Sequence, residues 1–78
     1  MITVHVNVEC EYPLSLKPKI IGLNDSNIMK VSVLTGKPQI MVIVSAQNSS
    51  QLEETVIKIQ NLQHVHRTYT QWEVGAEQ

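Results

Sequence analysis

The stretch "TGKPQIMVIVSA", residues 35–46, decides the fold that the sequence predicts. It opens with Gly and Pro, which favour a tight turn, and continues as a strand with apolar side chains on both faces. The residues before it, "NIMKVSVL" at 27–34, alternate apolar and polar side chains, as a strand with one buried face does. Two strands joined by four turn-forming residues predict a β-hairpin.

Two further strands are predicted on either side of the hairpin. Residues 2–10, "ITVHVNVEC", alternate without a fault, which gives the clearest strand pattern of the chain. Residues 64–74, "HVHRTYTQWEV", are rich in Thr, Tyr, Trp and Val, the residue types that strands prefer. The last residues, 74–78, are predicted to be a flexible tail.

Two helices are predicted between these strands. The first is short, begins at Ser15 as its capping residue, and places Pro18 in its first turn, where a missing N–H leaves no helix bond unmade. The second, within residues 48–63, begins with a capping box formed by Ser50 and Glu53. Apolar side chains repeat at helical spacing in both segments: Leu16, Ile20 and Leu23 in the first, and Leu52, Val56, Ile59 and Leu62 in the second.

The order of the predicted elements is strand, helix, strand, strand, helix, strand. With right-handed crossovers, this order predicts an α+β fold of the ferredoxin-like βαββαβ type, a four-stranded antiparallel sheet with two helices on one face. The first and third strands are central in this topology. A length of 78 residues suits a single domain, 1–78.

The open face of the sheet is predicted to be an interface. On the third strand, Met41 and Ile43 alternate with the residues that face the helices, so they lie on the face without helices. The chain has no Phe and one cysteine, so its core is small and aliphatic and no internal disulfide supports it. We expect Met41 and Ile43 to be buried at a dimer interface, in a homodimer or a higher ring oligomer. The alternative is that the chain's own loops or tail cover them.

The composition excludes several classes of protein. The net charge is −1 and the basic residues are spread along the chain, so we expect no direct nucleic acid binding. No apolar run approaches the roughly 20 residues of a membrane span, and the N-terminus alternates unlike a signal peptide. We therefore expect a cytoplasmic protein with no membrane association. Catalytic residues at motif spacing cannot be identified, so we expect no enzyme and no cofactor.

The histidines and the cysteine each have two interpretations. His5, His64 and His66 could approach one another if the first and last strands are neighbours, and three imidazoles suit zinc or copper. No recognisable ligand spacing accompanies them, so solvated histidines without a metal are expected. Cys10 occupies an apolar position of an alternating strand, which favours a buried thiol over a reactive one.

Residues 31–74 resemble a known regulatory module. The sequence "TGKPQ" at 35–39 stands where the family has T-G-x-x-D, and "HVHRTYT" at 64–70 stands where it has G-V-x-R-T-x-T. Together with the strand order, these motifs make the chain similar to the RAM (regulation of amino-acid metabolism) domain of the Lrp/AsnC, or feast/famine, transcription regulators. Full-length regulators carry an N-terminal helix-turn-helix domain, whereas this sequence begins on its first strand, so we expect a stand-alone RAM domain.

The resemblance implies a non-catalytic regulatory and oligomerisation module. In the family, an amino acid or similar small molecule binds between protomers, and the matching ligand-binding residues here are Thr35, Gly36, Gln39, Thr68 and Thr70. Gly36 lets backbone N–H groups approach a carboxylate closely. Gln39 replaces the family's acidic residue and offers neutral hydrogen bonds in place of a charge, and His64 replaces its glycine. Association with a full-length Lrp/AsnC-type regulator is a further expectation.

The motif residues also have structural interpretations without a ligand, and two other functions are compatible with the sequence. The Thr35–Gly36 pair is also typical of a simple hairpin turn, and threonines such as Thr68 and Thr70 are common in strands. A peptide-binding maturation chaperone uses the same strand order, as do the small maturation proteins of periplasmic nitrate reductase. A scaffold that only oligomerises is the third candidate.

Overall fold

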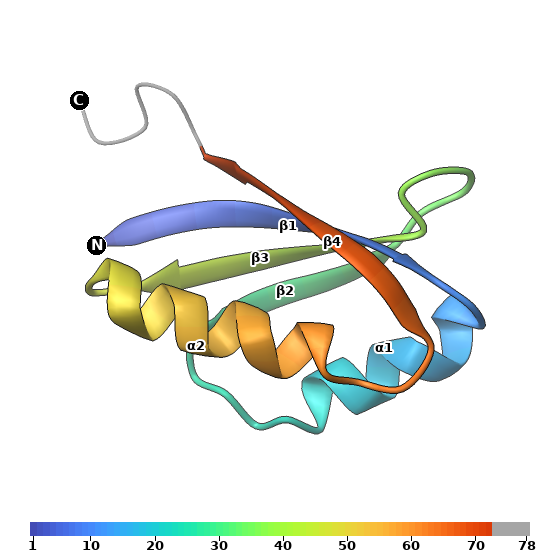
Figure 1. The fold of residues 1–78 in the computed structure, drawn as a ribbon, viewed down its shortest axis with the longest axis horizontal. Coiled ribbons are helices and arrows are strands. Elements are labelled where there is room, and N and C mark those ends of the chain that lie inside the picture. Colours follow the sequence, from blue (N-terminus) through green and yellow to red (C-terminus); the bar gives the residue numbers. More distant parts are fainter. Residues whose placement is uncertain (73–78) are drawn as a thin grey trace.

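The chain forms the six elements that the sequence predicts, in the predicted order (Figure 1). The computed structural model describes residues 1–72. The elements are β1 (Ile2–Cys10), α1 (Pro13–Ile21), β2 (Ile28–Val33), β3 (Ile40–Ala46), α2 (Ser49–Gln60) and β4 (Val65–Trp72). The predicted tail, 74–78, and the end of the predicted last strand lie outside the described residues. Neither helix in this part of the chain is long and apolar enough to cross a membrane.

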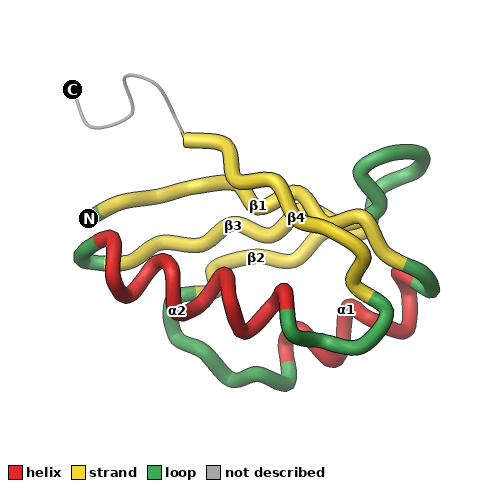
Figure 2. Tube along the Cα trace, viewed as in Figure 1, coloured by secondary structure: helices red, strands yellow, loops and turns green. Residues whose placement is uncertain are grey.

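The four strands form one antiparallel sheet in the order β2-β3-β1-β4. β1 and β3 are therefore central, and β2 and β4 form the two edges. Both helices lie on the same face of the sheet, as Figures 1 and 2 show. This arrangement confirms the predicted ferredoxin-like fold, and it leaves the other face of the sheet without a helix.

The hydrophobic core lies between the sheet and the two helices. Val6 of β1 stands opposite Val42 of β3, and both side chains are fully buried. The other buried apolar residues are Val4, Val8, Cys10, Leu16, Ile20, Ile40, Val44, Ala46, Leu52 and Ile59. Because side chains alternate between the two faces of a strand, the alternation in β1 and β3 fixes which set is buried.

Helix α1 starts earlier than predicted. Pro13 occupies the first turn of the helix, and Tyr12 precedes it as the capping residue with φ 56°. Proline is favoured at a helix start because its ring holds φ near the helical value and the missing N–H has no helical partner there. The prediction of Ser15 as the cap is therefore wrong, and Pro18 lies inside the helix rather than in its first turn. Leu16 and Ile20 are buried as predicted, whereas Leu23 lies after the end of α1 and is partly buried.

Helix α2 also starts before its predicted cap. Asn48 is the capping residue, and its side-chain oxygen accepts a hydrogen bond from the backbone N–H of Gln51 at 2.9 Å. The prediction that Ser50 caps the helix is wrong, because Ser50 lies within the first turn. Asn and Ser cap helices about equally well, and here Asn48 has the extended backbone (φ −147°) that a capping residue needs.

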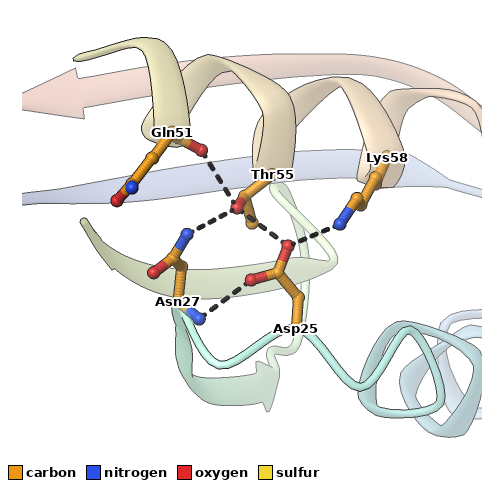
Figure 3. Close-up of polar contacts among 5 residues, drawn as sticks. All are labelled: Asp25, Asn27, Gln51, Thr55 and Lys58. Atoms are coloured by element: carbon orange, nitrogen blue, oxygen red, sulfur yellow. Dashed lines mark hydrogen bonds and ion pairs between the residues drawn. The ribbon is translucent and has the colours of Figure 1, made fainter. Parts of the chain in front are cut away.

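A polar network fastens the connection between α1 and β2 to helix α2 (Figure 3). The buried hydroxyl of Thr55 donates a hydrogen bond to Oδ2 of Asp25 at 2.9 Å, and the side-chain amide of Asn27 donates to the same hydroxyl at 3.2 Å. The ammonium group of Lys58 lies 3.1 Å from the same Asp25 oxygen. The network thus joins Lys58 of α2 to Asp25 in the connection that precedes β2.

Candidate functional site

The open face of the sheet carries a small apolar centre. Met41 stands opposite Asn7, and Ile43 stands opposite His5, on the two central strands. Both apolar side chains are partly buried by their neighbours. No helix of residues 1–72 covers this face (Figure 1). The structure thus places Met41 and Ile43 on the face that the alternation predicted.

Polar side chains flank this apolar centre on the β4 side, and they bond to one another. The side-chain amide of Asn7 donates to Oε1 of Gln71 at 2.8 Å, from β1 to β4. Arg67 donates to the hydroxyl of Tyr69 at 2.7 Å, and its guanidinium carbon lies 5.8 Å from the centre of the same ring. An ordered polar border around a small apolar centre is the composition that a protein interface has.

The predicted T-G turn is the tip of the hairpin between β2 and β3. Gly36 has φ 85°, in the left-handed region where a glycine is favoured. The backbone N–H of Leu34 donates to the Gln39 carbonyl at 2.8 Å and closes the turn. The side-chain oxygen of Gln39 accepts a hydrogen bond from the backbone N–H of Cys10 at 3.3 Å, so this side chain is tied to the end of β1. Thr35 and Gly36 are exposed.

Thr68 and Thr70 share one face of β4, and it is the face that the helices cover. They stand opposite Val8 and Val6, whose side chains are buried in the core. The hydroxyl of Thr68 accepts a hydrogen bond from the side-chain amide of Gln60, on α2, at 2.9 Å. The two threonines therefore lie beside α2.

The predicted ligand residues thus fall in two places within one chain. Thr35, Gly36 and Gln39 belong to the β2–β3 hairpin, whereas Thr68 and Thr70 belong to β4. In the sheet, β1 lies between β3 and β4. The two groups therefore lie on different elements, and β1 separates the strands that carry them.

A groove that the sequence did not predict lies between α2 and β4. The groove has a volume of about 290 Å³ and is lined by Leu52, Glu53, Val56, Ile57, Gln60, Thr70 and Trp72. Ile57 and Trp72 are large apolar residues, yet they are 50% and 56% exposed. Ile57 is an apolar residue outside the predicted apolar face of α2, and this was the signal that could have revealed the groove.

The three histidines lie in two places. His5 stands opposite Gln71, towards the other end of β4 from His66. His64 precedes β4 with φ 75°, so it lies outside the strand that the sequence predicted to begin at residue 64. Nδ1 of His64 and Nε2 of His66 are 3.8 Å and 3.6 Å from Oε1 of Glu11. Within residues 1–72, no group of three histidine, cysteine or acidic side chains is placed to hold a metal ion.

Cys10 is part of the core, as its position in the alternating strand predicted. Its side chain belongs to the cluster of buried apolar residues. Burial raises the pKa of the Cys10 thiol above its ordinary value, because the thiolate would lose its hydration. A thiol in this environment is a poor nucleophile at neutral pH.

Solved structures share this fold. The crystal structure of TTHA0845 from Thermus thermophilus matches with a TM-score of 0.82 at 25% sequence identity, over 94% of this chain and 92% of that chain. MtbAldR, a regulator of the Lrp/AsnC family, matches with a TM-score of 0.72 at 14% identity, over 94% of this chain and 51% of that chain. The chain therefore spans about half the length of MtbAldR.

Comparison of the sequence with known families and curated proteins gives no match. No family model matches the chain, and no curated protein matches it. The shared architecture is thus what relates the chain to known proteins, and it is an architecture that also occurs in an Lrp/AsnC-family regulator.

Proposed function

We propose that this chain is a non-catalytic, cytoplasmic regulatory module that self-associates through the open face of its sheet. In this proposal a small molecule, such as an amino acid, binds between protomers. The module acts on transcription by joining full-length regulators of the Lrp/AsnC type, not by touching nucleic acid itself. Its fold is the one found in MtbAldR, which supports a regulatory role.

The single observation that carries the proposal is the apolar pair Met41 and Ile43 at the centre of a sheet face without helices. An apolar patch on a flat surface is stabilised when a partner removes it from water, at about 25 cal/mol per Å² of apolar area. A second copy supplies the same patch across a two-fold axis, which makes the interface self-complementary.

The division of the predicted ligand residues supports a site between chains. The hairpin tip with Gly36 is exposed, and a glycine at positive φ leaves its backbone N–H groups accessible to an anion. Thr68 and Thr70 contribute hydroxyl groups from a separate strand. A small zwitterionic ligand with a carboxylate at one end suits two such groups from neighbouring protomers.

Self-association is tested by measuring mass in solution. We expect the wild-type chain to sediment as a dimer or larger, and Met41→Lys to shift it towards the monomer, because a buried ammonium group is costly at a dry interface. Met29→Lys is the matched control, since Met29 is 63% exposed on the edge strand β2. A monomeric wild-type chain at the highest soluble concentration would refute the proposal.

Ligand binding is tested by thermal shift across the twenty amino acids. We expect one or a few of them to raise the melting temperature, and Thr68→Ala and Gln39→Ala to reduce that rise. Glu54→Ala, at an exposed position of α2 outside the groove, is the control. If no amino acid gives a shift while self-association is retained, the chain is an oligomerisation scaffold.

A peptide-binding chaperone is the second candidate, and one observation favours it. The groove between α2 and β4 is partly apolar and lies beside an edge strand, which can accept an extended peptide by strand addition. This function predicts a chain that stays monomeric and retains apolar peptides. Peptide-array binding together with a monomeric mass would favour it over the regulatory module.

A further inference from the structure

Strand β4 is an edge of the sheet with little protection against pairing. It has eight residues and, within residues 1–72, pairs with β1 on one side only. An edge strand presents a row of unpaired N–H and C=O groups, which natural proteins commonly guard with charge, proline, bulges or shortness. The protection of β4 is confined to its first residues, where Arg67 carries a full charge at neutral pH and the register against β1 shifts opposite Glu9 and Cys10. The strand contains no Pro or Gly.

The other edge of the sheet is better guarded. Strand β2 has six residues, its register against β3 shifts between Ile28 and Lys30, and Lys30 is exposed. Shortness, irregularity and an exposed lysine all discourage strand addition. The two edges therefore differ, and β4 is the one open to a partner strand.

The groove beside β4 favours a second copy of this chain as that partner. A two-fold axis perpendicular to the sheet would continue it from β4 into β4 of the copy, with the α2 helices of both copies on the same face. Each groove would then be bordered by β4 and α2 of the other copy. Ile57 and Trp72, which are about half exposed in the single chain, would lie at this junction.

The geometry of antiparallel pairing limits the register. In an antiparallel pair, two opposite residues either exchange both backbone hydrogen bonds or exchange none. Two identical strands related by a two-fold axis satisfy this only when the axis passes between the two copies of the same residue. An axis at Arg67 would oppose two like charges, which is unfavourable. An axis at Thr68 would leave Trp72 opposite position 64, outside the strand. An axis at Thr70 would pair only residues 68–72 of each copy. An axis at Tyr69 pairs residues 66–72, so Trp72 stands opposite His66 of the copy and Thr68 opposite Thr70, and aromatic and threonine cross-strand pairs are stabilising.

We propose that two copies of this chain pair edge to edge through β4, with Tyr69 on the two-fold axis, to form a continuous eight-stranded sheet. This contact is separate from the open face and does not depend on it. The edge is about 26 Å long at about 3.3 Å per residue, and one strand layer plus one helix layer is about 20 Å deep. The contact therefore covers roughly 500 Å² per copy, below the roughly 800 Å² of a standard interface, so the pair is weak and is best detected covalently.

Disulfide trapping tests this arrangement in the full chain. The background carries Cys10→Ala, which removes the native thiol, and Met41→Lys, which removes association through the open face. Tyr69→Cys places two thiols directly opposite each other, about 4.5–5.5 Å apart between Cα atoms, within the range that a disulfide bridges. Thr70→Cys is the matched control, because its two copies would stand in diagonal positions about 7–8 Å apart between Cα atoms, beyond that range.

We expect mild oxidation to give a covalent dimer with Tyr69→Cys, at least severalfold more than with Thr70→Cys, in variants whose circular dichroism is that of the wild type. Equal trapping at the two positions, or none, would overturn the edge pairing. Trapping of Tyr69→Cys that occurs with Met41 present and disappears with Met41→Lys would also overturn it. That last result would assign the contact to the open face and so support the proposed function.

Discussion

The hydroxyl of Thr55 donates a hydrogen bond to Oδ2 of Asp25 at 2.9 Å, joining the middle of α2 to the connection that precedes β2 (Figure 3). Thr55 is the one polar residue among the buried positions of residues 1–72, with 1% of its surface exposed. A buried hydroxyl without a partner would be costly, so its bonds to Asp25 and Asn27 explain why α2 tolerates a threonine on its inner face.

Thr55→Val tests this relationship because valine keeps the shape and removes the hydroxyl. We expect the free energy of unfolding to fall by about 1–3 kcal/mol, since Asp25 loses a donor in a partly enclosed position. Urea denaturation followed by circular dichroism measures the change. Thr70→Val, at an exposed threonine of β4, is the control and is expected to change stability by less than about 0.5 kcal/mol. An equal effect of both substitutions would show that the Asp25 bond has no special role.

The stability of the protein should depend on the ionisation of Asp25. Burial opposes the charged carboxylate, but hydrogen bonds from the Asn27 backbone N–H, Lys58 and Thr55, with the positive charge of Lys58, lower the pKa of Asp25 overall. A carboxylate with a lowered folded-state pKa stabilises the protein above the unfolded-state value of about 3.9, and this contribution is lost as the pH falls through the folded-state pKa.

Asp25→Asn isolates this contribution. We expect the variant to be less stable than the wild type at pH 6, and the difference in unfolding free energy to shrink as the pH falls below about 3.9. Denaturant titrations of both proteins from pH 2.5 to pH 7 measure it. Glu54→Gln, at an exposed carboxylate of the same helix, is the control. A stability difference that stays constant with pH would contradict the role of the Asp25 charge.

The strands could be predicted from the sequence because their pattern reflects one-sided burial. Every second residue of β1 from Val4 to Cys10 faces the core, and the alternation of apolar and polar residues in the sequence predicts this burial. The helix starts could not be predicted to the residue. Each helix has two competing start signals two positions apart: Pro13 and Ser15 for α1, and Asn48 and Ser50 for α2. The free energies of starting the helix at the one or the other differ by about 1 kcal/mol or less.

The candidate site was predictable only in part, and for a similar reason. The alternation placed Met41 and Ile43 on the open face, because that assignment depends on residues close together in the chain. The groove between α2 and β4 depends on how far the helix stands from the sheet edge. That spacing is set by tertiary packing, so Ile57 and Trp72 could not be paired from the sequence.

Two isoleucines of α2 offer a matched test of the core. Ile59 is fully buried and Ile57 is 50% exposed, although they are two residues apart on the same helix. We expect Ile59→Ala to lower the free energy of unfolding by about 2–5 kcal/mol, because it leaves a cavity among aliphatic neighbours. Ile57→Ala should cost about 0.5 kcal/mol or less in the monomer. Comparable losses in urea denaturation would mean that Ile57 is buried by a partner under the conditions used.

His64 should be replaceable by glycine with less damage than by alanine. Its backbone has φ 75°, a conformation that favours glycine, which is also the residue that the Lrp/AsnC family motif has at this position. The ring of His64 lies edge-on to Tyr12, with 5.4 Å between ring centres, and Glu11 is nearby, so both substitutions lose these contacts.

Alanine also keeps the strain of the left-handed conformation, about 1–2 kcal/mol, whereas glycine relieves it. We therefore expect His64→Gly to be the more stable of the two variants by about 1 kcal/mol in urea denaturation, a difference that the greater flexibility of unfolded glycine reduces but does not cancel. An alanine variant as stable as the glycine variant, or more stable, would show that the backbone at this position does not hold the left-handed conformation in solution.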